Sequence, residues 1–197
     1  MQTIVLASGN QGKLRELQSL LKPAGYTAVS QRDFAVPEAE ETGLSFVENA
    51  IIKARNACHH SGLPALADDS GLEVDALDGR PGIYSARFSG PGASDASNNE
   101  HLLDALRGVA NADRTARYQC IIVAMRHARD PSPIICQGTW EGRILEQPAG
   151  SGGFGYDPLF LVEEYQCSAA QLPAAVKNHA SHRGQAMRQL LSLLARL

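Results

Sequence analysis

Residues 3–14 read Thr-Ile-Val-Leu-Ala-Ser-Gly-Asn-Gln-Gly-Lys-Leu, which is a short apolar run followed by a glycine-containing turn. Residues 3–7 are typical of a buried strand. Leucines then recur at helical spacing as far as Leu21, and Pro23 and Gly25 close that helix. A strand that passes through such a turn into a helix favours an α/β protein, and we predict a mixed α/β fold.

The remaining chain alternates β-rich runs with helical patterns and contains no repeat or long linker, so we expect a single domain over residues 1–197. A second helix is expected from Ser45, where Glu48 completes a capping box, to Gly62. The other expected elements are an extended segment at 83–88, a helix marked by leucines near 102–109, strands at 63–67, 117–125, 133–137 and 140–145, and a last helix from about residue 181 to the end.

Apolar residues make up 44% of the 197 residues and charged residues 20%, which is the balance of a soluble globular protein. Lysine and arginine number 18 against 21 acidic residues, and a net charge of −3 without a basic stripe argues against nucleic-acid binding. No apolar run approaches the ~20 residues of a membrane span, and the N-terminus has no signal-peptide pattern. We therefore expect no membrane partner and a cytoplasmic protein whose widely spaced cysteines stay reduced, namely Cys58, Cys120, Cys136 and Cys167.

The turn Ser8-Gly9-Asn10-Gln11-Gly12-Lys13 has the residues of an anion site. Glycines let the backbone approach a phosphate, the free N–H groups at the helix start point at it, and Lys13 adds positive charge. The spacing is not that of a Walker A loop. Taken alone, the stretch is equally compatible with an ordinary glycine-rich turn that carries a surface lysine.

Two acidic pairs are candidates for metal binding or acid–base chemistry. Asp68-Asp69-Ser70 follows a predicted strand, where α/β folds place ligands, and adjacent carboxylates suit Mg²⁺. Glu40-Glu41 lies upstream of the second helix. If they have no function, the first pair is an exposed acidic turn and the second lies in a solvated loop.

Three further stretches carry groups of the kind that bind nucleotides. Asn49, Lys53 and Asn56 share one helix face, which is either solvated or points a cation and two amides at a polyphosphate. Phe154-Gly155-Tyr156-Asp157 lies in the densest glycine cluster, where a ring either packs in the core or stacks on a base. Ser181-His182-Arg183 opens the last helix, either as a capped start or as a reader of carbonyl oxygens and phosphate.

Together these groups form the combination that hydrolysis of a nucleoside triphosphate requires, and they resemble the inosine triphosphate pyrophosphatase family. Within that family the chain is most similar to the bacterial enzymes that act on non-canonical purine triphosphates. The resemblance covers nearly the full length. Its ordered motifs are Ser8-Gly9-Asn10 with Lys13, Glu41-Thr42-Gly43, Glu48-Asn49-Ala50 with Lys53-Ala54, residues 67–72, 81–87 and 153–158, Lys177, and Ser181-His182-Arg183-Gly184. One departure is Ser8, where many members carry threonine.

The resemblance implies a long curved mixed sheet flanked by helices, two lobes with a central substrate cleft, and a homodimer. It implies Mg²⁺-dependent cleavage of ITP, dITP and XTP to the monophosphate and pyrophosphate, which removes deaminated purines from the nucleotide pool. Residues 8–13 and Lys53 would hold the triphosphate. Asp69 would accept the proton of the attacking water, bind the metal, or both, and Glu41 and Asp68 are further candidate ligands. The nucleoside would be held by Ser70, Phe154, Gly155, Tyr156, Asp157, Lys177, His182 and Arg183. Among these, the Arg183 donors suit the oxygen at position 6 of the base.

Three alternatives stay open at this point. A haloacid-dehalogenase-type phosphatase needs a nucleophilic Asp-x-Asp, which residues 68–71 lack, and it would release orthophosphate. A Maf-like nucleotide pyrophosphatase carries serines and paired arginines where this chain has Ser8-Gly9-Asn10 and Lys13. A nucleotide-binding module would bind ITP without turnover.

Overall fold

The computed structural model describes residues 2–9 and 11–194, and for Gln11, Lys13 and Glu16 it describes the backbone alone. The α-helices of this range are α1 (Gln11–Leu21), α2 (Phe46–Ser61), α3 (Asp95–Ala105), α4 (Ala174–Ala180) and α5 (His182–Leu193). The strands are β1 (Gln2–Leu6), β2 (Tyr26–Ser30), β3 (Ala65–Val74), β4 (Thr115–Met125), β5 (Ile134–Ile144), β6 (Phe160–Val162) and β7 (Cys167–Ser168). Short 3-10 helices occupy Lys22–Ala24, Gln31–Phe34, Asp75–Leu77, Gly82–Arg87, Asn111–Asp113 and Ala169–Gln171.

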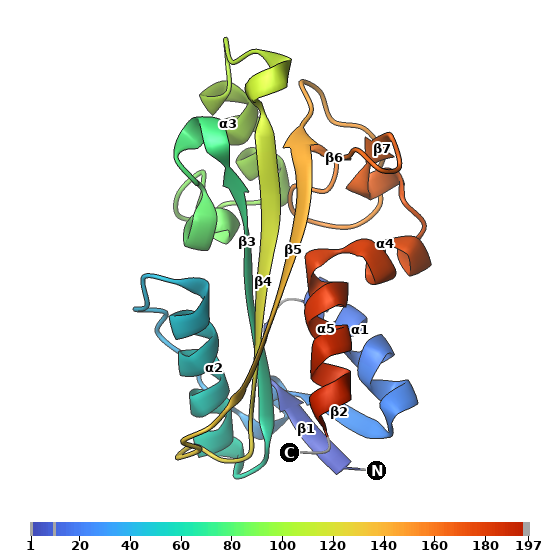
Figure 1. The fold of residues 1–197 in the computed structure, drawn as a ribbon. Coiled ribbons are helices and arrows are strands. Elements are labelled where there is room, and N and C mark those ends of the chain that lie inside the picture. The colour runs from blue at the N-terminus through green and yellow to red at the C-terminus, as the bar shows by residue number, and fades with distance from the viewer. Residues whose placement is uncertain (1, 10, 195–197) are drawn as a thin grey trace. The chain divides into compact units, whose positions relative to one another are not determined.

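The strands form one mixed sheet in the order β2-β1-β3-β4-β5-β6-β7 (Figure 1). β1 pairs in parallel with both β2 and β3, whereas β6 pairs antiparallel with both β5 and β7. Helix α1 connects β1 to its parallel neighbour β2, which is the crossover that parallel strands require. The predicted class, a mixed α/β protein with helices flanking its sheet, is confirmed.

The chain divides into two compact units, and the division falls inside three strands. The first unit comprises Met1–Asp69, Cys120–Gly138 and Arg183–Leu197. The second comprises Ser70–Gln119 and Thr139–His182. Strands β3, β4 and β5 therefore each contribute residues to both units.

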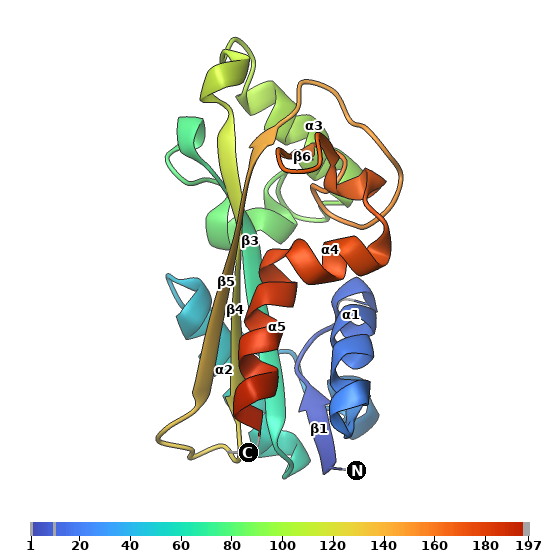
Figure 2. The same cartoon turned by 45° about the vertical axis from the view of Figure 1, so that its right-hand side comes forward.

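In the first unit, helices cover both faces of the sheet because side chains alternate along each strand. Ile4 and Leu6 of β1 belong to a core with the leucines of α1 and α5. Val5 belongs to a second core with the small residues of α2, which include Ala50 and Ala54. Figures 1 and 2 show α1 and α5 on one side of these strands and α2 on the other.

In the second unit, one sheet face is apolar and the other is polar. The core contains the aromatic side chains of Tyr118, Trp140 and Phe160, packed with leucines of α3. On the opposite face, Arg117 lies 2.8 Å from Asp75 in an ion pair. Strand alternation thus separates a core face from a charged face, as in a sheet with one face in water.

Two local predictions near residue 70 are wrong. β3 does not end at residue 67 but continues through Asp68-Asp69-Ser70-Gly71 to Val74, so the acidic pair lies inside a strand. Residues 82–87 form a 3-10 helix rather than an extended segment. Ser85 explains this turn, because its hydroxyl donates to Gly82 O at 2.6 Å and accepts from Leu72 N at 2.8 Å.

Other boundaries also shift. Residues 133–137 and 140–145 belong to one strand, β5. The helix expected near 102–109 is α3, which begins earlier because Ser94 caps it and ends at Ala105. The last helix is preceded by a separate helix, α4, so Ser181 ends one helix and α5 starts at His182. None of the described helices has the length and apolar character needed to cross a membrane.

Candidate active site

Two carboxylates of the first unit meet at one ammonium group. Lys53 Nζ donates to Asp69 Oδ1 at 2.6 Å and lies 3.6 Å from Glu41 Oε1. The side chains of Lys53 and Asp69 are 14% and 10% exposed, and that of Glu41 is 32% exposed. Helix α2, strand β3 and the segment before α2 thus bring together three residues that lie in separate stretches of the sequence.

The surroundings of Lys53 keep its ammonium group charged. Burial alone lowers the pKa of Lys53, but the carboxylates of Asp69, Asp68 and Glu41 outweigh burial and raise the pKa above its usual value. A fixed positive charge beside Asp69 is suited to stabilising anionic oxygen atoms.

Asp68 faces away from Asp69, since adjacent strand residues point to opposite faces of a sheet. Its buried carboxylate oxygen Oδ2 accepts from Arg183 Nε and Nη2, both at 3.2 Å. Cys120 Sγ lies 4.0 Å from the same oxygen. Asp68 is therefore the counter-ion of Arg183 in α5, and metal binding by the adjacent carboxylates stays a prediction.

Pairing of β1 with β3 places the predicted phosphate turn beside the acidic pair. Ala7 N donates to Leu66 O at 2.8 Å, and the parallel register pairs Leu6 with Leu66. The turn after β1 therefore starts level with the residues that precede Asp69 in β3. This is the edge of the sheet at which α/β folds place ligands.

The phosphate turn itself is described in part. Ser8, Gly9 and Gly12 are half-buried, and α1 begins at Gln11. Asn10 lies outside the described residues, and so do the side chains of Gln11 and Lys13. Phosphate binding by the turn stays a prediction.

In the second unit, Asp157 organises the glycine cluster. Its Oδ2 accepts from Phe154 N at 2.8 Å and from Lys177 Nζ at 2.6 Å. Lys177 Nζ also lies 4.8 Å from the centroid of the Phe154 ring, within the range of a cation–π interaction. A Cβ atom at Gly153 would overlap Asp157 Oδ2, so glycine is required there. Three predicted nucleoside residues, Phe154, Asp157 and Lys177, therefore form one cluster.

Helix α3 fixes the same loop through residues that the sequence analysis missed. Gly155 N donates to Asp95 Oδ2 at 2.7 Å, and Asn99 Nδ2 donates to Gly155 O at 2.8 Å. The hydroxyl of Tyr156 donates to Ser85 O at 2.7 Å, and burial raises the pKa of Tyr156. Some 56 to 71 residues separate the partners, and no local pattern relates them.

His182 stacks on an aromatic pair that was also missed. Its ring lies 4.6 Å from that of Tyr118 at an interplanar angle of 12°, and 6.3 Å from that of Trp140. This stacking fixes the plane of a buried imidazole at the start of α5.

Ser70 is half-buried and is the first residue of the second unit in β3.

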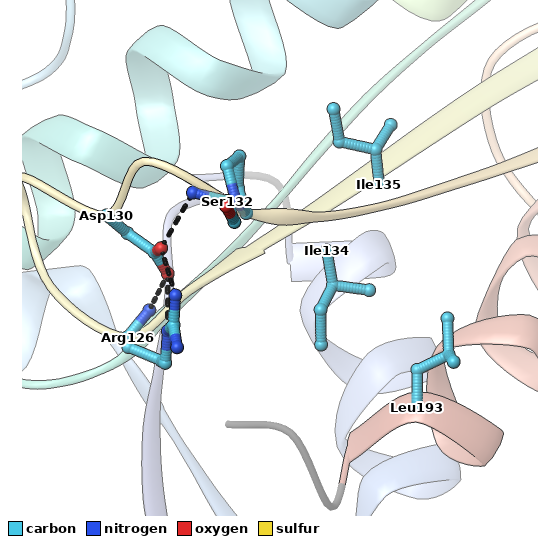
Figure 3. Close-up of a pocket in the computed structure, with 7 residues that line it drawn as sticks. Arg126, Asp130, Ser132, Ile134, Ile135 and Leu193 are labelled. Atoms are coloured by element: carbon cyan, nitrogen blue, oxygen red, sulfur yellow. Dashed lines mark hydrogen bonds and ion pairs between the residues drawn. The ribbon is translucent and has the colours of Figure 1, made fainter.

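A hollow of about 440 Å³ in the first unit contains none of the predicted site residues (Figure 3). It is lined by Arg126, Asp130, Ile134, Ile135 and Leu193, with Ser132 and Pro133. Arg126 donates to both carboxylate oxygens of Asp130, and these hydrogen bonds lower the pKa of Asp130. The Asp130 carboxylate thus holds a turn, and we assign no catalytic or binding role to the hollow.

The chain is similar to proteins of known family over nearly its whole length. The model of the Ham1 family matches residues 4–193. A relative from Thioalkalivibrio sulfidiphilus, named dITP/XTP pyrophosphatase, is 60% identical over 191 residues, which are 97% of each chain. The structure of a HAM1 protein from Coxiella burnetii matches with a TM-score of 0.92 at 49% identity, over 100% of both chains. A Ham1 protein from Staphylococcus aureus matches with a TM-score of 0.87 at 38% identity, over 98% of both chains.

Proposed function

The chain belongs to the Ham1 family, and from this membership we propose that it is a nucleoside triphosphate pyrophosphatase for dITP, XTP and ITP. Water attacks the α-phosphorus, the bond from that phosphorus to the bridging oxygen breaks, and the nucleoside monophosphate, pyrophosphate and a proton are released. The observation that supports this reaction is the convergence of Asp69 and Glu41 on Lys53, in a chain 60% identical to a dITP/XTP pyrophosphatase. The biological role would be the removal of deaminated purines from the nucleotide pool.

Asp69 is the proposed acceptor of the proton that leaves the attacking water. Its contact with Lys53 holds one carboxylate oxygen in place at 2.6 Å. Lys53 stays an ammonium at neutral pH and stabilises negative charge on the phosphate oxygens. Residues 8–13 are the proposed cradle for the rest of the triphosphate, because they follow β1 beside the acidic part of β3.

The donor set around Lys53 fits Mg²⁺, which binds one or two carboxylates and takes its other ligands from water and phosphate oxygens. Glu41 and Asp69 both approach Lys53 Nζ, so their carboxylates face one region. The described residues contain no group of three or more ligand side chains, which agrees with an ion that depends on substrate oxygens. When bound, Mg²⁺ would supply positive charge to the leaving pyrophosphate. Asp68, whose Oδ2 pairs with Arg183, is a further candidate ligand.

The nucleoside is assigned to Ser70, to the 154–157 loop with Lys177, and to His182 and Arg183. The half-buried ring of Phe154 is a planar surface of the kind on which a base stacks, and Tyr118 holds the plane of the buried His182 imidazole. Arg183 is the proposed donor to the 6-oxygen that hypoxanthine and xanthine carry and adenine lacks. A homodimer and a cytoplasmic location complete the proposal.

Pyrophosphate release from ITP, XTP, dITP, ATP and GTP, each with and without Mg²⁺, tests the proposal. We expect fast release from the first three substrates only, and only with the metal. Equal turnover of ATP and GTP would contradict the proposed specificity while leaving the reaction intact. Orthophosphate as the product would indicate a phosphatase, and binding of ITP without turnover would indicate a nucleotide-binding module.

A further inference from the structure

Three polar residues of α2, Asn49, Lys53 and Asn56, contact successive positions of one upstream segment, residues 37–43. Asn56 Nδ2 donates to Pro37 O at 2.8 Å. Lys53 Nζ lies 3.6 Å from Glu41 Oε1, and Asn49 Oδ1 accepts from Gly43 N at 2.9 Å. The spacing of four and three residues puts all three side chains on one helix face. The segment therefore runs antiparallel to the helix, with Glu41 held between two amide anchors.

The contact at Gly43 is too close for any other residue. A Cβ atom there would lie 2.6 Å from Glu48 Cβ and 2.7 Å from Asn49 Oδ1. Asn49 is 1% exposed, so its accepted hydrogen bond is formed away from water. Buried polar groups that lose their partner are costly, and the segment is thus fixed at this end.

The chain that follows Gly43 is fixed as well. Glu48 Oε2 accepts from Leu44 N at 3.0 Å and from the Ser45 hydroxyl at 2.7 Å. Ser45 Oγ in turn accepts from Glu48 N and caps α2. The predicted cap at Ser45 is confirmed, and Glu48 also reaches Leu44 N. The result ties residues 43–45 to the first turn of α2.

From these contacts we propose that Asn49 and Asn56 are positioning residues, which hold Glu41 beside Lys53 and Asp69 and so set the affinity of that carboxylate pair for a divalent cation. Asn49 Oδ1 and Asn56 Nδ2 are used in these contacts, and phosphate binding by this helix face stays a prediction. The part that concerns the cation rests on the proposed function. The part that concerns the 37–43 segment rests on the contacts alone.

The same substitution at the two positions gives a matched test. Asn49 accepts a hydrogen bond, so Asn49→Asp keeps the acceptor and Asn49→Leu removes it. Asn56 donates, so Asn56→Asp removes the donor and places a carboxylate opposite Pro37 O. Each aspartate variant adds one negative charge to the same face of α2. Asn49 lies four residues before Lys53, and Asn56 lies three residues after it. His59→Ala, an exposed change on the same helix, is the control.

The first measurement is hydrogen exchange of the Gly43 amide in the metal-free protein. We expect Asn49→Leu to lose protection at Gly43 and Asn49→Asp and His59→Ala to retain it. The second is the Kd for Mn²⁺ alone, by electron paramagnetic resonance. We expect Asn49→Leu and Asn56→Asp to weaken Mn²⁺ binding about tenfold or more, which is usual for groups that orient a metal ligand.

Two results would overturn the proposal. Unchanged Gly43 protection in Asn49→Leu would show that Asn49 does not hold the segment. Equal Mn²⁺ affinity of Asn49→Asp and Asn56→Asp would show that the hydrogen bond donated by Asn56 does not set the affinity, since the two variants carry the same added charge. If the unmodified protein binds no Mn²⁺ without substrate, the cation part fails; pyrophosphate release still decides the proposed function, and the exchange data still decide whether the segment is held. Thermal unfolding of each variant checks that the fold is retained.

Discussion

Asp68 and Asp69 are neighbours in β3 and take opposite partners: Arg183 of α5 donates to Asp68 at 3.2 Å, and Lys53 of α2 donates to Asp69 at 2.6 Å. Because successive side chains of a strand face opposite ways, one carboxylate pairs with Arg183 of α5 and the other with Lys53 of α2. The two residues are chemically identical, so their different surroundings assign them different roles.

Replacement of each aspartate by asparagine separates these roles. Asp69→Asn is expected to lose at least ~10² in kcat, which is the usual contribution of a positioned general base. Asp68→Asn removes the charge that pairs with Arg183, and breaking a buried ion pair typically destabilises by about 3–5 kcal/mol. Turnover of ITP and urea unfolding measure the two effects. Near-normal turnover by Asp69→Asn would remove that residue from the mechanism.

Arg183→Lys tests whether the guanidinium reads the base. The variant keeps a cation beside Asp68 but loses the two nitrogen donors that now reach its Oδ2. If Arg183 reads the 6-oxygen, the ratio of kcat/KM for ITP over ATP should fall by at least about tenfold, because sites built on a hydrogen bond discriminate strongly. A ratio equal to that of the unmodified protein would show that another group selects the base.

The local elements were predictable because their signals are local. The strand–turn–helix of residues 3–21, the cap at Ser45 and the end of α2 at Gly62 all follow from spacings within a few residues. Gly62 adopts φ of 69°, where glycine is favoured. The spacing of Asn49, Lys53 and Asn56 also placed them correctly on one helix face, although not their partners.

The site was less predictable because its contacts join distant residues. Asp68-Asp69-Ser70-Gly71 has the composition of a turn, and Lys53 and Arg183, which neutralise the two carboxylates, help to make it acceptable inside a strand. Likewise, His182 and its partner Tyr118 are 64 positions apart in the chain, and nothing in either neighbourhood indicates the stacking. Alternation in β4 identifies Tyr118 as a core residue but not as a support for an imidazole.

The pKa of Lys53 leads to a prediction about stability and pH. Since this pKa is raised in the folded protein, the contribution of Lys53 is fully present below its unfolded pKa, near 10.5, and is lost as the pH rises through the folded value. The difference in free energy of unfolding between the unmodified protein and Lys53→Met should therefore be constant from pH 7 to about pH 9.5. Urea unfolding at several pH values measures it. A difference, taken as unmodified protein minus variant, that rises with pH within this window would indicate that the pKa is lowered.

The cysteines should differ in reactivity. Cys58, Cys120 and Cys136 are buried, whereas Cys167 is half-buried. Burial raises the pKa of Cys58 to about 11, so little of its thiolate is present at pH 8. Titration of the folded protein with a chromogenic disulfide at pH 8 should show one fast thiol, and Cys167→Ser should abolish that phase. Retention of the fast phase in the variant would place the reactive thiol elsewhere.

Gly153 and Gly92 provide a matched pair for the loop that carries Phe154. Both have positive φ, 74° and 75°, so alanine strains the backbone equally at the two sites. At Gly92 a Cβ atom meets nothing within 4 Å, whereas at Gly153 it overlaps Asp157 Oδ2, the atom that holds Phe154 N and Lys177 Nζ. Gly153→Ala should therefore be less stable than Gly92→Ala by about 1–3 kcal/mol, the usual result of overpacking.

The Cβ atom of Gly153→Ala should also displace the Asp157 carboxylate from Lys177, which raises the KM for ITP. Gly92→Ala leaves this pair in place, so its KM should be unchanged. Steady-state kinetics with ITP and urea unfolding of both variants measure the two differences. Equal stability would mean that the loop yields without moving Asp157. Equal KM values with unequal stability would mean that the Asp157–Lys177 pair supports the fold and takes no part in holding the nucleoside.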